Sequence, residues 1–422
     1  MTEEYIFYGA GSHSKMVMKS MLNIGISPVC FADRDEMKHN SIIETPFYGG
    51  KQDDIKVLPL EDAMKRYPDA NLYITVGPAL YPEVYEYLLT KNVPQARIKG
   101  PPLHCILIGN YMTITDDHIY TCPDKRIPVE LPRSGDIKKD TEAYSQLCMS
   151  LADDLKEGKA FACAGCQLLR AGCLQEEQEL KILNFALTGI CNFNCCYCIY
   201  KPDVDVNYDV YEMLSYFDKE KNIELVLLTT GELTISKYRD EILAYLKNSS
   251  MRGLLFTNAS IYLDEISHLM REKGLILNIS LDAGTRETYA RVKNSDCFDA
   301  VLKNIEKYVA SGGTYQVGLK YVILDGVNSE DRDIESFVNI AARLKTDVLI
   351  SHDMFSSFSP QSESVYATVT KFARLCIEND VPYMFSFLDK YYDRLRLDGL
   401  LDNKLRFVFD DYISGKLSSK DN

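Results

Sequence analysis

The chain has 422 residues, more than one hydrophobic core usually organises, so we expect two or three domains. With 46% hydrophobic and 26% charged residues, its composition is that of an ordinary soluble globular protein. Its 61 acidic and 47 basic residues give a net charge of −14, which argues against nucleic-acid and membrane-surface partners because both require clustered Lys and Arg.

The first residues, MTEEYIFYGAGS, carry two acids and no basic stretch before an apolar run, so we expect no secretory signal. No run approaches the roughly 18 apolar residues that a membrane span requires. These features predict a cytoplasmic protein. In that reducing compartment the 13 cysteines favour metal binding or redox chemistry over disulfides.

The N-terminal segment predicts a doubly wound, Rossmann-like α/β domain over residues 1–110. A strand at 5–8 is followed by the glycine turn GAGSHS, a helix, and a second strand that ends at Asp33. Further strands are expected at 71–77 and 105–109, with a helix between them.

The glycine turn is a candidate nucleotide site. Gly9, Gly11 and the helix N-terminus could cradle a phosphate, and Asp33 could bind ribose hydroxyls. Ser14 stands where a third glycine is usual, which argues against a nicotinamide cofactor. The stretch from YGAGSHSKMV to PFYGG resembles the N-terminal domain of bacterial sugar-modifying acyltransferases and polysaccharide-locus methyltransferases, which implies a nucleotide-sugar ligand. A structural domain without a ligand is the alternative.

Residues 111–180 are predicted to be a hairpin followed by a cysteine-rich linker. The hairpin covers 111–121, a loop rich in proline and charge follows it, and a helix is expected at about 137–157. The segment FACAGCQLLRAGC then has C-x2-C-x6-C spacing, which indicates a metal site. The candidate ligands are Cys163, Cys166, Cys173 and, as the fourth, Cys122. A second 4Fe–4S cluster, structural zinc and no metal are all open interpretations.

From residue 181 onward, strands and helices alternate strictly. This alternation predicts a parallel sheet with helices outside it, open or curled into a partial barrel, over residues 181–385. Ligands in such folds bind at the C-terminal ends of the strands. Residues 386–422 are predicted to form C-terminal helices.

The stretch CNFNCCYC follows the first of these strands. Cys191, Cys195 and Cys198 have C-x3-C-x2-C spacing on a loop, and soft thiolates select iron–sulfur clusters or zinc. A cubane held by three thiolates keeps one iron open, whereas tetrahedral zinc would need a fourth ligand, for which Cys196 or His352 is available.

Three further motifs accompany this loop: TTGE at 229–232, ISLDAGT at 279–285, and Arg291 downstream. Together they resemble the radical S-adenosylmethionine (SAM) superfamily over about residues 181–355. The resemblance implies a partial (β/α)6 barrel, a 4Fe–4S cluster and SAM as cofactors, and an electron donor of the flavodoxin or ferredoxin type. The auxiliary clusters of such enzymes usually lie C-terminal to the barrel, where this chain has only Cys376 after residue 300.

The resemblance also implies roles for individual residues. Cys191, Cys195 and Cys198 would bind three irons, and Cys196 is then a spare thiol that we expect to be buried. The SAM-side positions would be Tyr197 beside the adenine, Thr230, Gly231 and Glu232 at the α-amino group, Asn258, Ser280 and Asp282 towards the ribose and substrate, and Arg291 at the carboxylate. Local capping by Asp282 and Thr285 is the structural alternative for the last motif.

The predicted function is reductive cleavage of SAM to a 5′-deoxyadenosyl radical that abstracts hydrogen from a small polar substrate, such as a sugar or nucleotide-sugar. Epimerisation, dehydrogenation or rearrangement would follow. The alternatives are a peptide-modifying radical SAM enzyme with an auxiliary cluster and a non-catalytic iron–sulfur or zinc module. The candidate substrate-side residues, at the ends of late strands, are Lys320, Tyr321, Asp353 and His352, the last as a catalytic proton relay.

Overall fold

The protein is described by a computed structural model with two compact units. The described residues are 4–11, 14, 18, 27–43, 55–76, 80–100, 103–105, 107–122, 130–156, 169–171, 179–186, 189–198, 206, 208–220, 223–312, 316–353, 362–386, 388, 391, 394–395 and 398–400. One unit comprises 1–108, 126–129 and 145–178, and the other comprises 109–125, 130–144 and 179–422. In the described part of the chain, no helix is both long and apolar enough to cross a membrane.

The first unit is built on a six-stranded sheet with β1 near its middle. The strand order is β3 (Ile42–Ile43), β4 (Ile55–Leu58), β2 (Pro28–Ala32), β1 (Tyr5–Tyr8), β5 (Asn71–Ile74) and β6 (Ile98–Lys99). All neighbouring pairs are parallel except β3 with β4. A separate antiparallel pair joins β7 (Leu103–Cys105) to β11 (Leu169–Ala171).

Alternating side chains of the strands pack on opposite faces of this sheet. On one face Ile6 and Tyr8 join a core with α2 (Leu60–Arg66) and α3 (Tyr81–Thr90). On the other face Phe7 and Phe31 pack with their ring centroids 5.7 Å apart. The described part of the unit also contains the short 3-10 helices η1 (Glu36–Lys38) and η3 (Gln95–Arg97).

The second unit is built on a ten-stranded sheet. In spatial order its strands are β10 (Glu130–Pro132), β9 (His118–Tyr120), β8 (Tyr111–Ile114), β12 (Ile182–Phe185), β13 (Leu225–Leu228), β14 (Arg252–Thr257), β15 (Ile276–Ser280), β16 (Val317–Ile323), β17 (Asp347–His352) and β18 (Tyr383–Ser386). From β8 to β18 every neighbouring pair is parallel.

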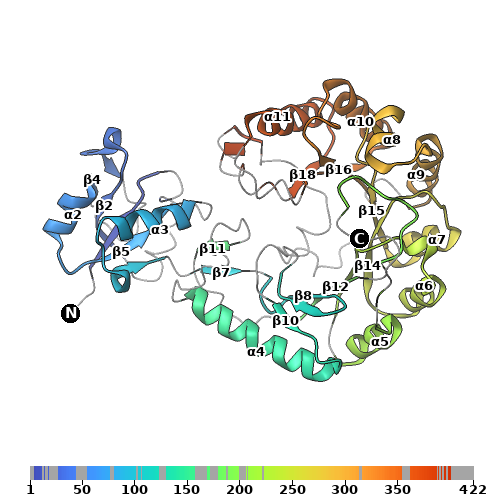
Figure 1. The fold of residues 1–422 in the computed structure, drawn as a ribbon, viewed down its shortest axis with the longest axis horizontal. Helices are drawn as coiled ribbons and strands as arrows, with labels where there is room; N and C mark the ends of the chain where they lie inside the picture. Colours follow the sequence, from blue (N-terminus) through green and yellow to red (C-terminus); the bar gives the residue numbers. More distant parts are fainter. Residues whose placement is uncertain are drawn as a thin grey trace. The chain divides into compact units, whose positions relative to one another are not determined.

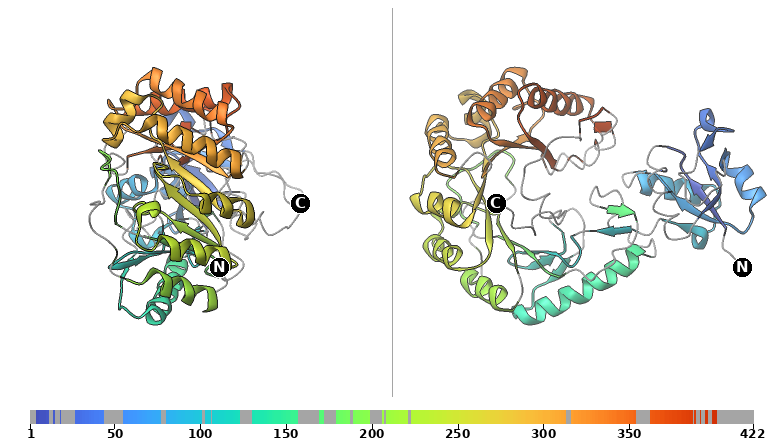
Figure 2. Two further views of the ribbon diagram at one scale, coloured as in Figure 1. Left: turned by 90° about the vertical axis from the view of Figure 1, so that its right-hand side faces the viewer. Right: turned by 180° about the vertical axis from the view of Figure 1, so that it is seen from behind.

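Helices follow the strands of this sheet and lie on its outer, convex side (Figures 1 and 2). They are α5 (Val210–Glu220), α6 (Arg239–Asn248), α7 (Asp264–Lys273), α8 (Arg286–Lys293), α9 (Phe298–Gly312), α10 (Asp331–Leu344) and α11 (Glu363–Glu378), with the 3-10 helix η5 (Leu233–Ile235) before α6. The remaining helix, α4 (Ile137–Lys156), has residues in both units.

The two faces of the parallel sheet differ in character. Tyr321 lies on the outer face, where its ring centroid is 4.8 Å from that of Phe337 in α10. Since neighbours in a parallel pair point to the same side, strand alternation places Lys320 on the inner face. Helix contacts therefore identify which side chains of each strand face the interior.

The hairpin at 111–121, which we expected to belong to a linker segment, is part of the ten-stranded sheet. Its first strand, β8, is buried at all four positions and pairs in parallel with β12. The stretch expected to be a loop after it contains β10, which pairs with β9. A short strand at the edge of a sheet has too few residues to show a periodic pattern, so its sequence resembles a loop. Pairing with the neighbouring strand stabilises it. The C-terminal residues 401–422, for which we expect helices, lie outside the described residues.

Candidate active site

The cysteine loop, residues 189–198, follows β12 at the C-terminal edge of the parallel sheet. Its backbone is turned by a hydrogen bond from the amide of Cys198 to the carbonyl of Cys195, 3.0 Å. Cys191 and Cys195 are partly buried, Cys198 is exposed, and all three are free cysteines. The three thiols of the C-x3-C-x2-C pattern therefore lie on one short loop at the edge where ligands bind in this class of fold.

The C-terminal end of α8 holds one side of this loop. The amide of Cys196 donates to the carbonyl of Val292 over 2.9 Å, which satisfies a carbonyl that the end of the helix leaves free. Asn294, in a left-handed conformation at the C-cap, donates its side-chain amide to the carbonyl of Asn194 over 2.5 Å. The end of one helix thus fixes the backbone of the middle of the loop.

The residues after β14 hold the other side. Asn258 Nδ2 donates to Oδ1 of Asn192 over 2.9 Å and lies 3.9 Å from Sγ of Cys191. Asn192 Nδ2 in turn donates to Oγ of Ser260 over 2.8 Å. Asn258 is 8% exposed, so its bond to Asn192 is partly shielded from water, whereas the bond from Asn192 to Ser260 is exposed.

Glu232 of the TTGE motif lies beneath this contact. Its carboxylate accepts hydrogen bonds from the amide of Asn258 at 2.7 Å and from the hydroxyls of Thr234 and Thr257 at 2.8 and 2.9 Å. Burial raises the pKa of this carboxyl group, against the lowering effect of these donors. Glu232, which we expected at the SAM amino group, therefore uses its carboxylate to connect the loops that follow β13 and β14.

The rest of the TTGE motif is placed beside the cysteine loop. The amide of Glu232 donates to the carbonyl of Ile190 over 2.9 Å. Gly231 has a φ of +71°, a conformation that favours glycine. Thr230 is buried, and no hydrogen bond of its side chain is seen among the described residues.

Asp282 of the SLDAGT motif is fully buried in a network with Tyr197 and Lys293. The Tyr197 hydroxyl donates to Oδ2 of Asp282 over 2.6 Å, and Lys293 Nζ pairs with the same oxygen. Lys293 Nζ also donates to the Tyr197 hydroxyl over 3.1 Å. The other carboxylate oxygen of Asp282 accepts the amide of Val322 at 2.7 Å.

This network includes a residue that the sequence analysis missed, Lys293. It is 1% exposed, and although burial opposes its charge, the charges of Asp282 and Cys195 leave its pKa raised. Asp282 has a φ of +56°, so the strand ends in an unusual turn that the surrounding bonds hold. Asp282, which we expected to line the ribose, thus connects the cysteine loop to β16 and α8.

Three other residues of this motif show how the segment is fixed. A Cβ at Gly284 would lie 2.0 Å from the backbone oxygen of Asp333, so only glycine allows this approach to α10. Thr285 caps α8 through its side chain, as the structural alternative for this motif expects. Ser280 is on the inner face, in register with Lys320. Arg291 is on the exposed side of α8, with its guanidinium 3.9 Å from Glu330.

His352 and Lys320 lie on opposite faces of the sheet. His352 is in register with Ile323, so it lies on the outer face of the sheet, the face on which Tyr321 packs against the helices. Its side chain is buried, with 6% exposed. Lys320 is on the inner face, where burial lowers its pKa and the charge of Asp282 opposes that effect. Of these two candidate substrate-side residues, the structure brings Lys320 to the interior near the cysteine loop.

Several buried polar side chains on the inner face have atoms without partners. Asn278 and Asp347 flank Gly318 in register, and Asn278 Nδ2 and Oδ1 and Asp347 Oδ1 make no hydrogen bond. Ser351, also on the inner face, has an unpaired hydroxyl. Burial raises the pKa of Asp347 to about 7. Buried polar atoms without partners are uncommon and require an explanation.

The donor set of the cysteine loop fits an iron–sulfur cluster with an open site. Burial raises the pKa of Cys195 to about 11 and also raises that of Cys191, so binding to iron would release protons. The Lys293 charge opposes the shift at Cys195. Three soft thiols on one loop suit iron or zinc chemistry. Within the described ranges, no three His, Cys, Asp or Glu side chains are grouped around a single metal-ion position.

The expectation that Cys196 is a buried packing residue is wrong. Cys196 is exposed, and only its backbone is engaged, through the bond to Val292. Two consecutive residues on a tight loop point in different directions, and the thiol after Cys195 points outwards. Of the cysteines outside the two clusters, Cys30, Cys105, Cys148 and Cys376 are buried and Cys297 is partly exposed.

The glycine turn of the first unit is internally bonded. Gly9 has a φ of +109°, and a Cβ there would lie 2.6 Å from a side-chain carbon of Val76. Asp33 accepts from the amide of Ala10 over 2.7 Å and from Lys38 Nζ over 3.0 Å. Gly11, by contrast, has open space where a Cβ would stand.

The second cysteine set is only partly described. Cys122 follows β9 and is partly exposed. Cys163, Cys166 and Cys173 lie outside the described residues, so the predicted grouping of these four stays a prediction.

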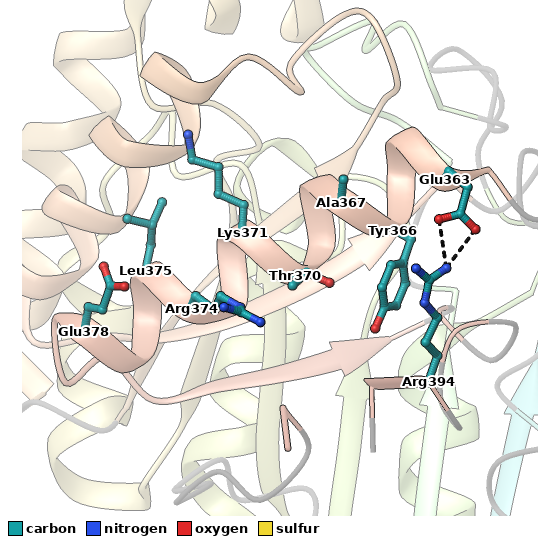
Figure 3. A pocket seen from close by; sticks show the side chains of 9 residues that line it. All are labelled: Glu363, Tyr366, Ala367, Thr370, Lys371, Arg374, Leu375, Glu378 and Arg394. Carbon is teal, nitrogen blue, oxygen red and sulfur yellow. Dashed lines mark hydrogen bonds and ion pairs between the residues drawn. The ribbon is translucent and has the colours of Figure 1, made fainter. Parts of the chain in front are cut away.

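A pocket of about 520 Å³ lies along the surface of α11 (Figure 3). The ion pair of Glu363 with Arg394, 2.8 Å, closes one end of it, and Lys371 and Glu378 are among its other lining residues. None of its lining residues comes from the cysteine loop or the strands that hold it. It is therefore separate from the candidate active site.

One comparison with known proteins covers the part of the chain that carries this site. Residues 185–338 match the model of the radical SAM superfamily. A probable GTP 3′,8-cyclase of Saccharolobus islandicus (strain Y.N.15.51 / Yellowstone #2) is 29% identical over 173 residues, which are 40% of this chain and 54% of that protein. A probable GTP 3′,8-cyclase of Pyrococcus abyssi is 32% identical over 154 residues, 35% of this chain and 49% of that protein.

The chain spans about half the length of the curated relatives it matches. Among solved structures, Streptococcus suis SuiB bound to precursor peptide SuiA is 12% identical with a TM-score of 0.43, and the match covers 64% of this chain and 68% of that one. The radical SAM superfamily uses a 4Fe–4S cluster and SAM as cofactors. Residues 185–338 are a radical SAM superfamily domain.

Proposed function

We propose that the enzyme cleaves SAM reductively and that the resulting 5′-deoxyadenosyl radical abstracts hydrogen from a small polar substrate. The observation that carries this proposal is the loop with Cys191, Cys195 and Cys198, held from both sides at the C-terminal edge of a parallel sheet. Bound there, the cluster would supply an open iron for SAM and the electron for its cleavage. We also propose that β12 to β17 and their helices form the partial (β/α)6 barrel of the family.

The residues around the loop divide into two groups under this proposal. Glu232 and Asp282 have their carboxylates occupied by protein donors, so their role is to hold the walls of the site. Thr230, Gly231 and Ser280 are the positions we assign to SAM, with the backbone of Tyr197 beside the adenine. The assignment of Asn258 to the ribose side remains a prediction, since its side chain binds Asn192. The assignment of Arg291 to the carboxylate also remains a prediction, since its side chain is exposed.

The inner face of the sheet supports a polar substrate. Lys320 and the unpaired polar atoms of Asn278 and Ser351 face the interior, where a substrate with hydrogen-bonding groups would give them partners. The second candidate function is cyclisation of a nucleotide, because both relatives described above are named probable GTP 3′,8-cyclases. Neither is named for a sugar substrate.

The other two predictions extend this function. Cys122, Cys163, Cys166 and Cys173 would hold an auxiliary cluster, and the first unit would present a nucleotide-sugar at its glycine turn. Because Asp33 already accepts from Ala10 and Lys38, a ribose hydroxyl would have to share that carboxylate. Protection of the protein against heat by UDP-sugars and not by NAD would support the second prediction.

Metal analysis and spectroscopy of the anaerobically purified, reconstituted enzyme test the proposal. We expect about four irons and four sulfides per chain for one cluster and about eight of each for two. A reduced-state electron paramagnetic resonance (EPR) signal that changes when SAM is added would support binding at the open iron. Stoichiometric zinc at the cysteine loop with no iron would contradict the proposal.

A further inference from the structure

The turn that follows β14 has a backbone conformation that alanine disfavours. Ala259 is fully buried and has a φ of +54°, in the left-handed region where a Cβ is crowded by the following carbonyl oxygen. Such a conformation persists only where neighbouring groups hold it in place. On the strand side, the amide of Ala259 donates to the Thr257 hydroxyl over 3.0 Å. The carbonyl side of the turn is held by a different element.

Helix α9 holds the carbonyl side of the turn from one of its faces. Asn304 Nδ2 donates to the carbonyls of Ala259 and Ser260 over 2.9 and 3.2 Å. One helical turn later, the Tyr308 hydroxyl accepts from the amide of Leu263 over 3.0 Å. Because residues four apart lie on the same side of a helix, Asn304 and Tyr308 hold the start and the end of one loop against α9.

The turn at Ala259 also sets the direction of the contacts with the cysteine loop. Asn258 Oδ1 accepts the amide of Ser260 over 2.9 Å, so it is Asn258 Nδ2 that donates to Asn192. The Ser260 hydroxyl accepts from the side-chain amide of the same Asn192. Since Asn192 directly follows Cys191, both sides of the turn bind the loop next to one of its three thiols.

We propose that Asn304 is a positioning residue that acts on the cysteine loop through the turn at Ala259. This inference rests on the proposed function, because the position of the loop matters only if the loop holds a cluster. Without the Asn304 amide, an alanine in a left-handed conformation loses the support of its carbonyl side. The turn then relaxes, and Asn258 and Ser260 lose their alignment with Asn192.

The rate at which the anaerobic, reconstituted enzyme loses iron to a chelator tests this role. We expect Asn304→Ala to lose iron about five- to thirtyfold faster than the wild type, the factor that corresponds to one or two hydrogen bonds. Adding Ala259→Gly to Asn304→Ala should return the rate towards the wild-type value, because glycine adopts a positive φ without crowding. Asn379→Ala, which removes an exposed bond at the end of α11, is the matched control and should keep the wild-type rate.

A second background separates positioning from a merely structural role. Asn192→Ala removes both contacts between the turn and the loop, so Asn304→Ala should not accelerate iron loss further in that background. The same acceleration in both backgrounds, with no recovery by Ala259→Gly, would overturn the inference.

Two further outcomes are informative. If Asn304→Ala does not retain its cluster, Asn304→Ala/Ala259→Gly decides, because retention supports the inference and loss overturns it. A wild-type enzyme without a cluster would overturn the proposed function, whereas a cluster-loaded wild type that loses iron at the same rate as Asn304→Ala would overturn only this inference.

Discussion

The side-chain amide of Asn258 lies 2.9 Å from Oδ1 of Asn192 and 3.9 Å from Sγ of Cys191. One residue at the end of β14 therefore contacts two residues of the cysteine loop that follows β12. Because β12 and β14 are separated by β13 in the sheet, this contact spans two strand intervals and fixes the loop over the sheet edge.

Asn258→Ala should lower the amount of cluster that the protein retains. The substitution removes the bond to Asn192 and leaves a partly buried loop without its support, at a cost of about 1–3 kcal/mol. Iron and sulfide per chain after reconstitution measure the effect. Asn248→Ala, which removes an exposed bond at the end of α6, is the control and should leave the iron content unchanged. Equal iron contents in both variants would show that the Asn258 bond does not support the loop.

Glu232→Gln should destabilise the enzyme although the two side chains have the same shape. Both carboxylate oxygens accept hydrogen bonds, and a Gln amide group would present N–H to an N–H or O–H donor. We expect a loss of about 1–3 kcal/mol in the free energy of unfolding, seen as a lower thermal midpoint. Glu378→Gln, at an exposed position of α11, should change nothing. An unchanged midpoint for Glu232→Gln would mean that the carboxylate is not the acceptor described here.

The sequence predicts the cysteine loop and the parallel sheet better than the contacts that hold the loop in place. The spacing of Cys191, Cys195 and Cys198 and the alternation of strands and helices are local patterns, and they predict the loop and the parallel sheet correctly. Lys293 was missed because a lysine in the last turn of a helix is usually solvated and favourable to the helix dipole. Only the tertiary structure brings it beside Asp282 and Tyr197.

Strand pairing was equally inaccessible from local pattern. The residues of β8 alternate as any hairpin strand does, and nothing in them indicates that β12 will pair with them in parallel. The strands β3, β4 and β6 are two to four residues long and were not predicted, because no adjacent motif marks them as the glycine turn marks the equally short β1. Polar residues on the inner face, such as Asn278, are visible in the sequence, but their burial depends on the curvature of the whole sheet.

Asp347 should make stability depend on pH. Its pKa is raised to about 7 in the folded enzyme, whereas the unfolded chain ionises near the usual value of 3.8. Between these values the unfolded state loses its proton first, so the free energy of unfolding falls as pH rises from about 4 to about 7 and is constant above that. The total is on the order of 4 kcal/mol.

Asp347→Asn should remove this slope, so that the variant is more stable than the wild type at pH 8 and similar to it near pH 4. Urea unfolding of the anaerobic protein across this range measures the difference. Asp296→Asn, at an exposed position, should follow the wild-type curve. A wild-type slope in Asp347→Asn would assign the pH dependence to another group.

Asn278→Leu should raise the thermal midpoint while harming the reaction. Both polar atoms of Asn278 are fully buried without partners, and replacing them with apolar atoms removes a penalty of about 1–3 kcal/mol. Asn304→Leu is the contrasting variant, because Asn304 donates to the carbonyls of Ala259 and Ser260 and its loss should lower the midpoint. A lower midpoint for Asn278→Leu as well would indicate a structural bond in place of a substrate contact.

The central claim is that the cysteine loop performs reductive cleavage of SAM, and the most direct test is 5′-deoxyadenosine formation by the dithionite-reduced enzyme. We expect the wild type and Cys196→Ala, which removes the exposed spare thiol, to form 5′-deoxyadenosine and methionine from SAM. Cys195→Ala should form neither, because two thiolates remain where three are needed. Undiminished 5′-deoxyadenosine in Cys195→Ala, or none in the iron-loaded wild type, would contradict the account.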